Sequence, residues 1–237
     1  MMKSFFKQYG ITIYILLLSV HLYAQILGEQ YATVQFITKA TLLPTLILFL
    51  ISQDSWQKSP ANKWFIIVAL LGSFLGDVLL TYENYFIAGM VAFMMTHVFN
   101  IVYWNQLKPS KENKIQSVYL VSLLFLSYCV FIYFQLHSSM GSLIYPVLVY
   151  MILICTAGIK AYRAILNQQA KWIAQLFWFP GMLFFICSDS VLAFNKFSWS
   201  IHHPIKHIGL VTMLTYGVAQ LLIVKGYEMY IKIEMEH

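Results

Sequence analysis

The sequence predicts an all-α integral membrane protein, built as an eight-helix transmembrane bundle. Of its 237 residues, 60% are hydrophobic and 10% are charged, and the mean hydropathy is +0.70. These values lie far outside the range of a soluble domain of this size. Long apolar runs recur along the chain, each close to the roughly 20 residues with which a helix crosses about 30 Å of hydrocarbon. Lipid cannot hydrogen-bond to irregular backbone, so each run is expected to be helical.

Short polar connections separate the eight expected spans. The spans lie near residues 10–27, 32–51, 63–81, 86–105, 117–136, 142–161, 172–194 and 206–225. The first follows Lys3 and Lys7, as the apolar run of a signal peptide would, but Leu22 stands where a cleavage site needs a small residue. We therefore expect a retained helix. No connection is long enough to fold separately, so residues 1–237 are expected to form a single polytopic membrane domain.

Individual residues indicate where the third, seventh and eighth spans begin and where the third packs closely. The third span begins at Lys63, and its Gly72 and Gly76 form a GxxxG face suited to close helix packing. The seventh begins at Trp172. Pro204 is expected in the first turn of the eighth, where the missing N–H of a proline costs nothing.

Basic residues predict the orientation of the bundle. With eight spans both termini lie on one side, and twelve of the fifteen Lys and Arg residues fall on that side. The other three are Lys39, Lys196 and Lys206. This bias predicts cytoplasmic termini, and the inner membrane if the cell is bacterial. The formal charge of +6 is dispersed over short loops, which suits anionic lipid head groups and excludes nucleic acid as a partner.

Two acidic residues, Asp77 and Asp189, are expected inside the spans. The other seven acidic residues fall in loops, at span ends or in the C-terminal tail. An ionised side chain near the bilayer centre costs at least about 2.5 kcal/mol, so both aspartates are candidate functional residues. The alternative is a polar contact that ties two helices together.

Helix geometry predicts where these groups lie in the membrane. At 1.5 Å per residue, Asp77 lies about 21 Å and Asp189 about 25 Å from the cytoplasmic end of its span. Lys39 falls in the same outer half, and His97 lies near the middle. We expect the four groups to line one cavity that opens outward. Alternatively, Lys39 extends to the interface and His97 is a core histidine bonded to a carbonyl group.

Histidine and cysteine residues do not predict a metal site. The run "IHHPIKH" places His203 and His207 on one helix face, but Pro204 lies between them at the start of a span, which favours an outward-facing interfacial pair. The cysteines lack paired spacing and are interpreted as small buried residues: Cys129, Cys155 and Cys187.

Five stretches spread over nearly all spans carry a family resemblance: "TKATLLPTLIL", "GSFLGDVLL", "MMTHVFNIVYW", "GMLFFICSDSVLAFNKF" and "TYGVAQLLIVKG". In this order and spacing, the chain resembles the YhhN family of lysoplasmalogenase-like membrane proteins. The resemblance implies an eight-helix fold and hydrolysis of the vinyl ether bond of lysoplasmalogens to a fatty aldehyde and a glycerophospho-base.

The resemblance also implies the residues of the site. The acidic pair is Asp77 and Asp189, with Lys39 and His97 as accompanying polar positions. Asn100 stands one turn after His97, where family members often have a tyrosine. We assign Asn100 and Lys39 to substrate binding, and Asp77, Asp189 and His97 to catalysis.

The chemistry of a vinyl ether suits a pair of buried carboxyl groups. The bond resists bases but yields to acid, because protonation of the carbon β to oxygen forms an oxocarbenium ion that water captures. Of two carboxyl groups in an apolar site, one can keep its proton near neutral pH while the other is an anion. We expect Asp77 to be the acid because it lies deeper, Lys39 to bind the lysolipid phosphate, and His97 to hold water or a carboxyl group. No cofactor is expected, and the substrate is a lysolipid within the bilayer.

Two other functions remain open at this point. The stretches "GDVLL" and "SDSVLAF" lie four spans apart, as in the parallel repeats of a transporter of lipid or small solutes. A metal-dependent lipid hydrolase would instead require Asp77, His97 and Asp189 to converge on one zinc ion.

Overall fold

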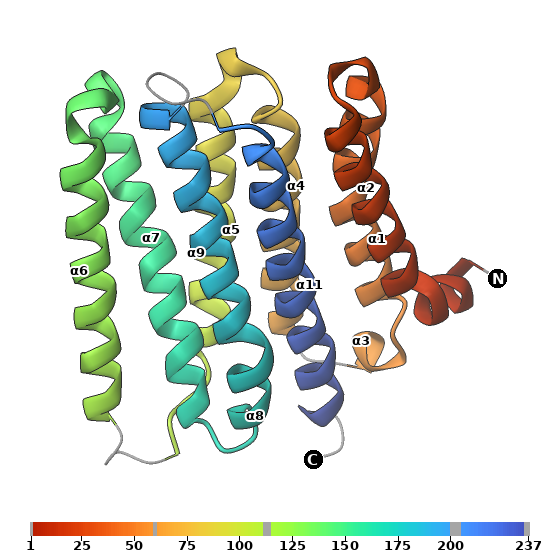
Figure 1. The fold of residues 1–237 in the computed structure, drawn as a ribbon. Helices are drawn as coiled ribbons and strands as arrows, with labels where there is room; N and C mark the ends of the chain where they lie inside the picture. Colours follow the sequence, from red (N-terminus) through yellow and green to blue (C-terminus); the bar gives the residue numbers. More distant parts are fainter. Residues whose placement is uncertain (1, 59–60, 111–114, 200–204, 235–237) are drawn as a thin grey trace.

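The computed structural model describes residues 2–58, 61–110, 115–199 and 205–234, and this part of the chain is helical without any strand (Figure 1). Eight helices of at least 16 residues form a bundle: α1 (Met2–Leu27), α2 (Ala32–Ile51), α4 (Trp64–Leu79), α5 (Phe86–Asn105), α6 (Ile115–Met140), α7 (Ile144–Arg163), α9 (Phe179–Phe194) and α11 (Ile208–Glu234). The all-α class predicted from composition is confirmed. Helices α2 and α5 have the bounds expected for the second and fourth spans.

The seventh span is more irregular than the sequence predicts. It begins with α8 (Lys171–Ile173), continues through the π-helical turn η7 (Ala174–Trp178) into α9, and ends in a second π-helical segment, η8 (Asn195–Trp199). Single π-helical turns inside helices often accompany functional sites. The helix that carries Asp189 therefore has such a turn on either side.

Six stretches of the described chain are long and apolar enough to cross a membrane. One of them, Gln116–Leu166, contains α6 and α7, which lie side by side and antiparallel because the chain reverses at Gly141, whose φ is 52° (Figure 1). Helix α4 is apolar but shorter, and its 16 residues extend about 24 Å. The chain is thus an integral, multi-pass membrane protein.

Close packing of α4 on α5 explains the GxxxG face. A Cβ atom on Gly72 would lie 2.8 Å from the Ala92 carbonyl oxygen, and one on Gly76 would lie 2.5 Å from the Phe93 ring. Neither distance is possible without a shift of the backbone or of the ring. The two glycines therefore let α4 approach α5 at the level where Asp77 enters the core.

The first helix begins, and α11 ends, at the same end of the bundle (Figure 1). There Lys7 donates a hydrogen bond to Asp54 of the short helix α3 (Asp54–Lys58), and Lys3 lies 3.7 Å from the other carboxylate oxygen. These two ammonium groups lower the pKa of the Asp54 carboxyl. Helix α3 in turn packs against α11, which ties the two ends of the chain together.

Candidate active site

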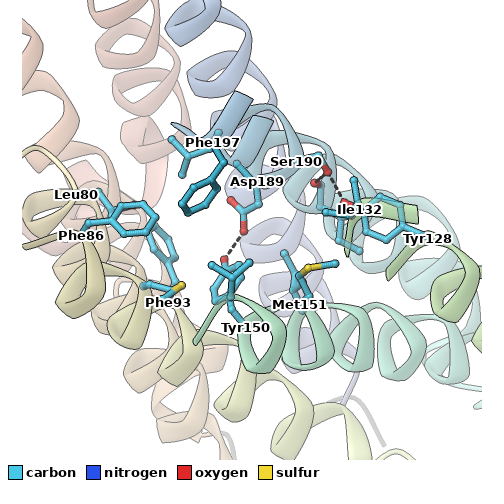
Figure 2. Close-up of a pocket in the computed structure, with 16 residues that line it drawn as sticks. Leu80, Phe86, Phe93, Tyr128, Ile132, Tyr150, Met151, Asp189, Ser190 and Phe197 are labelled. Carbon is cyan, nitrogen blue, oxygen red and sulfur yellow. Dashed lines mark hydrogen bonds between the residues drawn. The ribbon is translucent and has the colours of Figure 1, made fainter. Parts of the chain in front are cut away.

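A cavity of about 70 Å³ lies toward the opposite end of the bundle, among α5, α6, α7 and α9 (Figure 2). Its four polar lining residues are Tyr128, Tyr150, Asp189 and Ser190. The remaining wall is apolar: Leu80, Phe86, Met90, Phe93, Ile132, Val147, Met151, Ile154, Ile186, Leu192, Ala193 and Phe197. One carboxyl group thus faces a small cavity whose wall is mostly apolar, a setting that suits the apolar part of a substrate next to a single acidic group.

Tyr150 joins Asp189 to His97. Its hydroxyl group donates to Asp189 Oδ2, and its oxygen lies 3.2 Å from His97 Nε2 (Figure 2). Because a phenol has one proton, His97 must donate from Nε2 while Asp189 is ionised. When Asp189 carries a proton, the same three groups can reverse their hydrogen bonds. The arrangement is a short chain along which a proton can move to or from the carboxyl group.

Other polar atoms near the cavity were not found from the sequence. The hydroxyl groups of Tyr128 and Ser190 are hydrogen-bonded to each other on its wall (Figure 2). His97 is fully buried, and its Nδ1 atom has no hydrogen-bond partner among the described residues. Tyrosines concentrate at membrane interfaces, so the depth of Tyr150 inside an apolar span is the one signal that could have identified it.

Asp77 lies in a different environment, between α4 and α11. Its side chain is 3% exposed and accepts a hydrogen bond of 2.7 Å from Tyr216. Lys39 of α2 and Tyr14 of α1 are both close enough to interact electrostatically with this carboxyl group. Below it, Gln220 donates to Ser73, whose hydroxyl group lies 3.1 Å from that of Thr96. Asp77 is therefore held in a packed polar cluster and does not line the cavity.

Three aromatic rings lie against one another between the two carboxyl groups. Phe93, Phe185 and Tyr216 contact each other edge to face, with ring centroids 5.4 to 5.9 Å apart. Phe93 belongs to the cavity wall, whereas Tyr216 binds Asp77. The two carboxylates still interact electrostatically, but they do not share a cavity.

The four predicted groups are therefore not brought together in one cavity. Asp189 lines it and His97 reaches it through Tyr150, while Lys39 and Asp77 lie beyond the aromatic rings. Measured from the outer ends of the helices, Asp77 was expected to lie deeper than Asp189, and the structure shows the reverse. Helix α4 continues only two residues past Asp77, whereas α9 and η8 continue ten residues past Asp189. The rotation of each helix about its axis, which hydropathy does not report, decides which carboxyl group faces the cavity.

Asn100 lies one turn below His97 on α5, outside the cavity lining. It is 3% exposed and accepts a hydrogen bond of 2.7 Å from Tyr227. Tyr103 and Trp104 pack against the ring of the same tyrosine. The position that we assigned to substrate binding is thus a buried contact between α5 and α11.

Side chains suited to a metal do not cluster in the described part of the chain, where no group of three or more His, Cys, Asp or Glu residues could hold an ion. His203 lies outside the described residues, and His207 is exposed. The spacing of the cysteines predicts no pair, but Cys129 on α6 and Cys155 on α7 have sulfur atoms 3.2 Å apart. Both are free thiols. Of the three cysteines expected to be buried, only Cys155 is; Cys129 is partly buried and Cys187 is exposed on the surface of its helix.

Comparison with known proteins places this scaffold in a family. The model of the YhhN family matches residues 34–227, which include all five candidate residues. The chain belongs to the YhhN family. The resemblance found in the sequence motifs is therefore confirmed. No solved structure matches this YhhN protein significantly.

Several relatives carry an enzyme name. The chain is 28% identical to the mouse (Mus musculus) protein "Lysoplasmalogenase TMEM86B" over 89% of this chain and 83% of the relative. It is 30% identical to the human (Homo sapiens) "Lysoplasmalogenase TMEM86A" over 67% of this chain and 62% of the relative. The rat (Rattus norvegicus) TMEM86B protein is 29% identical, over 82% of this chain and 73% of the relative.

Proposed function

We propose that this YhhN protein is a lysoplasmalogenase, which hydrolyses the vinyl ether bond of lysoplasmalogens to a fatty aldehyde and a glycerophospho-base. The names of its relatives support this activity. The observation that carries the mechanism is the single carboxyl group of Asp189 in a mostly apolar cavity (Figure 2). The vinyl ether and the first carbons of a hydrocarbon chain suit such a wall, and a carboxyl group there can supply the acid that this bond requires.

The reaction starts with transfer of a proton from Asp189 to the vinyl carbon β to the ether oxygen. The resulting oxocarbenium ion takes up water, and the hemiacetal then breaks its carbon–oxygen bond to the glycerol. The proton that water loses returns to the carboxylate, so the enzyme ends as it began. Asp189 replaces Asp77 as the proposed acid, because only Asp189 lines the cavity.

Asp77 has the anionic role in this proposal. It accepts a hydrogen bond from Tyr216 and interacts with the charge of Lys39, two contacts that favour its anionic form, and it lies behind the aromatic rings. A fixed negative charge in a medium of low dielectric constant stabilises a cation that forms nearby. The Asp77 carboxylate therefore favours the oxocarbenium ion without touching the substrate.

Tyr150 and His97 return the proton. Tyr150 lines the cavity and bridges the imidazole and Asp189 by hydrogen bonds, so a proton that water gives to the tyrosine oxygen can pass to the carboxylate as the tyrosine donates its own proton to Asp189. His97 acts through the tyrosine, which makes it a positioning and relay residue in this scheme.

We also propose eight membrane spans with both termini in the cytoplasm. The cavity then opens toward the outer face, because Leu80 directly follows α4, Phe86 begins α5 and Phe197 lies in η8, all at the end of the bundle opposite the chain termini. Reporter fusions in the loop near Lys111 and after His237 should both report cytoplasm. An external signal from either fusion would contradict this orientation.

The test of the activity is product analysis in deuterated water. Purified protein is mixed with three lysolipids that differ only in the sn-1 linkage: vinyl ether, saturated ether and ester. The proposal predicts fatty aldehyde from the vinyl ether alone, with one deuterium at C2 when the aldehyde is reduced as it forms. Aldehyde without C2 deuterium would rule out proton transfer to carbon. No aldehyde from the vinyl ether would reject the activity and favour a transporter.

A further inference from the structure

A lysine stands beside the mouth of the Asp189 cavity. Lys196 belongs to η8, and its Nζ atom lies 5.4 Å from the ring centroid of Phe86. Phe86 and Phe197 are both part of the cavity wall, and their rings meet edge to face with centroids 6.1 Å apart (Figure 2). The ammonium group therefore lies against the aromatic rim of the cavity.

The charge of Lys196 is available to an anion. The ion pairs of the described residues involve Lys3, Lys7 and Lys225, and none involves Lys196. Its recorded contact is the face of Phe86, and an ammonium–ring contact of this kind is worth only about 0.5 to 1 kcal/mol at an exposed site. A phosphate oxygen would make a stronger, charge-assisted hydrogen bond.

The distance from Asp189 to Lys196 along the helix matches the distance in the substrate between the vinyl carbon and the phosphorus atom. Lys196 follows Asp189 by seven positions, about 10 Å along the axis at the rise of an α-helix. In a lysoplasmalogen, seven covalent bonds separate the vinyl carbon that accepts the proton from the phosphorus atom, about 9 Å in an extended chain of ordinary bond lengths. With the vinyl carbon at Asp189 and the first carbons of the hydrocarbon chain in the cavity, the phosphate falls beside Lys196.

We propose that Lys196 binds the phosphate of the lysolipid and thereby sets the register of the vinyl ether against Asp189. This assignment rests on the proposed function. It replaces Lys39, to which the sequence analysis gave the phosphate, because Lys39 acts on Asp77 beyond the aromatic rings. The enzyme then recognises its substrate at two points, the hydrocarbon chain in the cavity and the phosphate at the rim.

The experiment compares two substrates that differ only in the phosphate. Aldehyde release is measured in mixed micelles with a lysoplasmalogen and with the corresponding 1-alkenylglycerol, which lacks the phosphate and its base. Lys196→Gln should raise KM for the lysoplasmalogen about tenfold to a hundredfold, the loss expected for a hydrogen bond between charged groups. It should leave kcat and the kinetics with alkenylglycerol within about twofold. Lys196→Arg should restore most of the affinity.

Lys206 provides the matched control. It is an exposed lysine at the same end of the bundle and, unlike Lys196, does not lie over the Phe86 ring at the cavity rim. Lys206→Gln should leave KM unchanged for both substrates, which separates a specific phosphate contact from general attraction of the micelle surface.

Four results would overturn the assignment. Equal losses with both substrates would make Lys196 a structural residue. An unchanged KM in Lys196→Gln would remove it from the binding site while the proposed activity stands. A phosphate-specific rise in KM in Lys39→Gln alone would return the phosphate to Lys39. If the unmodified enzyme releases aldehyde from neither substrate, the proposed function fails and the assignment fails with it.

Discussion

Asp77 and Asp189 occupy similar places in two halves of the chain but different surroundings. Each lies in an apolar helix and accepts a hydrogen bond from a tyrosine, Tyr216 for Asp77 and Tyr150 for Asp189. Only Asp189 faces a cavity, whereas Asp77 is packed beneath aromatic rings with Lys39 nearby. A buried carboxyl group in a membrane protein is therefore not by itself a catalytic site. The two aspartates differ in whether the carboxyl group lines a cavity that part of a substrate can enter.

The neighbours of the two tyrosines also differ. Tyr150 continues to His97, whose second ring nitrogen is unpartnered among the described residues, so the cavity side ends in a group that can still exchange a proton. Tyr216 instead packs against Phe93 and Phe185. In the proposed mechanism the Asp189 side moves a proton and the Asp77 side holds a charge.

The largest effect is expected for Asp189→Asn. An amide has nearly the same shape but cannot deliver a proton to carbon, so turnover should fall about 10²- to 10⁴-fold. Aldehyde release from a lysoplasmalogen measures the loss, and an unchanged melting temperature in detergent shows that the fold is intact. Near-normal turnover of a folded Asp189→Asn protein would mean that this carboxyl group only ties helices together.

Asp77→Asn should lower turnover by at least about a hundredfold, because the neutral amide no longer stabilises the cation by its charge. The double variant with Asp189→Asn should cost little more than the worse single change, because groups that act as a unit are not additive. Simple multiplication of the two losses in the double variant would show that the carboxyl groups act independently.

A matched pair of phenylalanine variants sharpens the contrast between the tyrosines. Tyr150→Phe breaks the link between Asp189 and His97 and should lower kcat about tenfold, whereas Tyr216→Phe keeps the ring packing and should lower it only about threefold. Both are measured with the same lysoplasmalogen preparation. The reverse order would place the proton route on the Asp77 side.

The smallest effect is expected for metal removal. Incubation with EDTA should change turnover by less than about twofold, since neither the Asp189 cavity nor the Asp77 cluster requires a metal ion in the proposed mechanism. Changing His203 and His207 to alanine together should be equally mild. Activity that is lost with EDTA and restored by zinc would make the metal-dependent hydrolase the better explanation.

Several features were accessible from the sequence. Composition and apolar runs predicted the helices, because lipid allows few other structures for a chain this hydrophobic. The same argument identified Asp77 and Asp189, since a charge inside an apolar run is costly wherever the helix faces. The small-residue face at Gly72 and Gly76 correctly indicated close packing of α4 on α5.

Other features only the tertiary structure decided. Tyr150 is one of sixteen tyrosines, and its link to Asp189 depends on how α7 and α9 rotate against each other. Lys196 and Lys39 look alike in a hydropathy profile, yet one lies beside the cavity rim and the other beside Asp77. The physical reason is that hydropathy reports depth along the membrane normal, while the packing of helices far apart in sequence determines which side chains share a cavity.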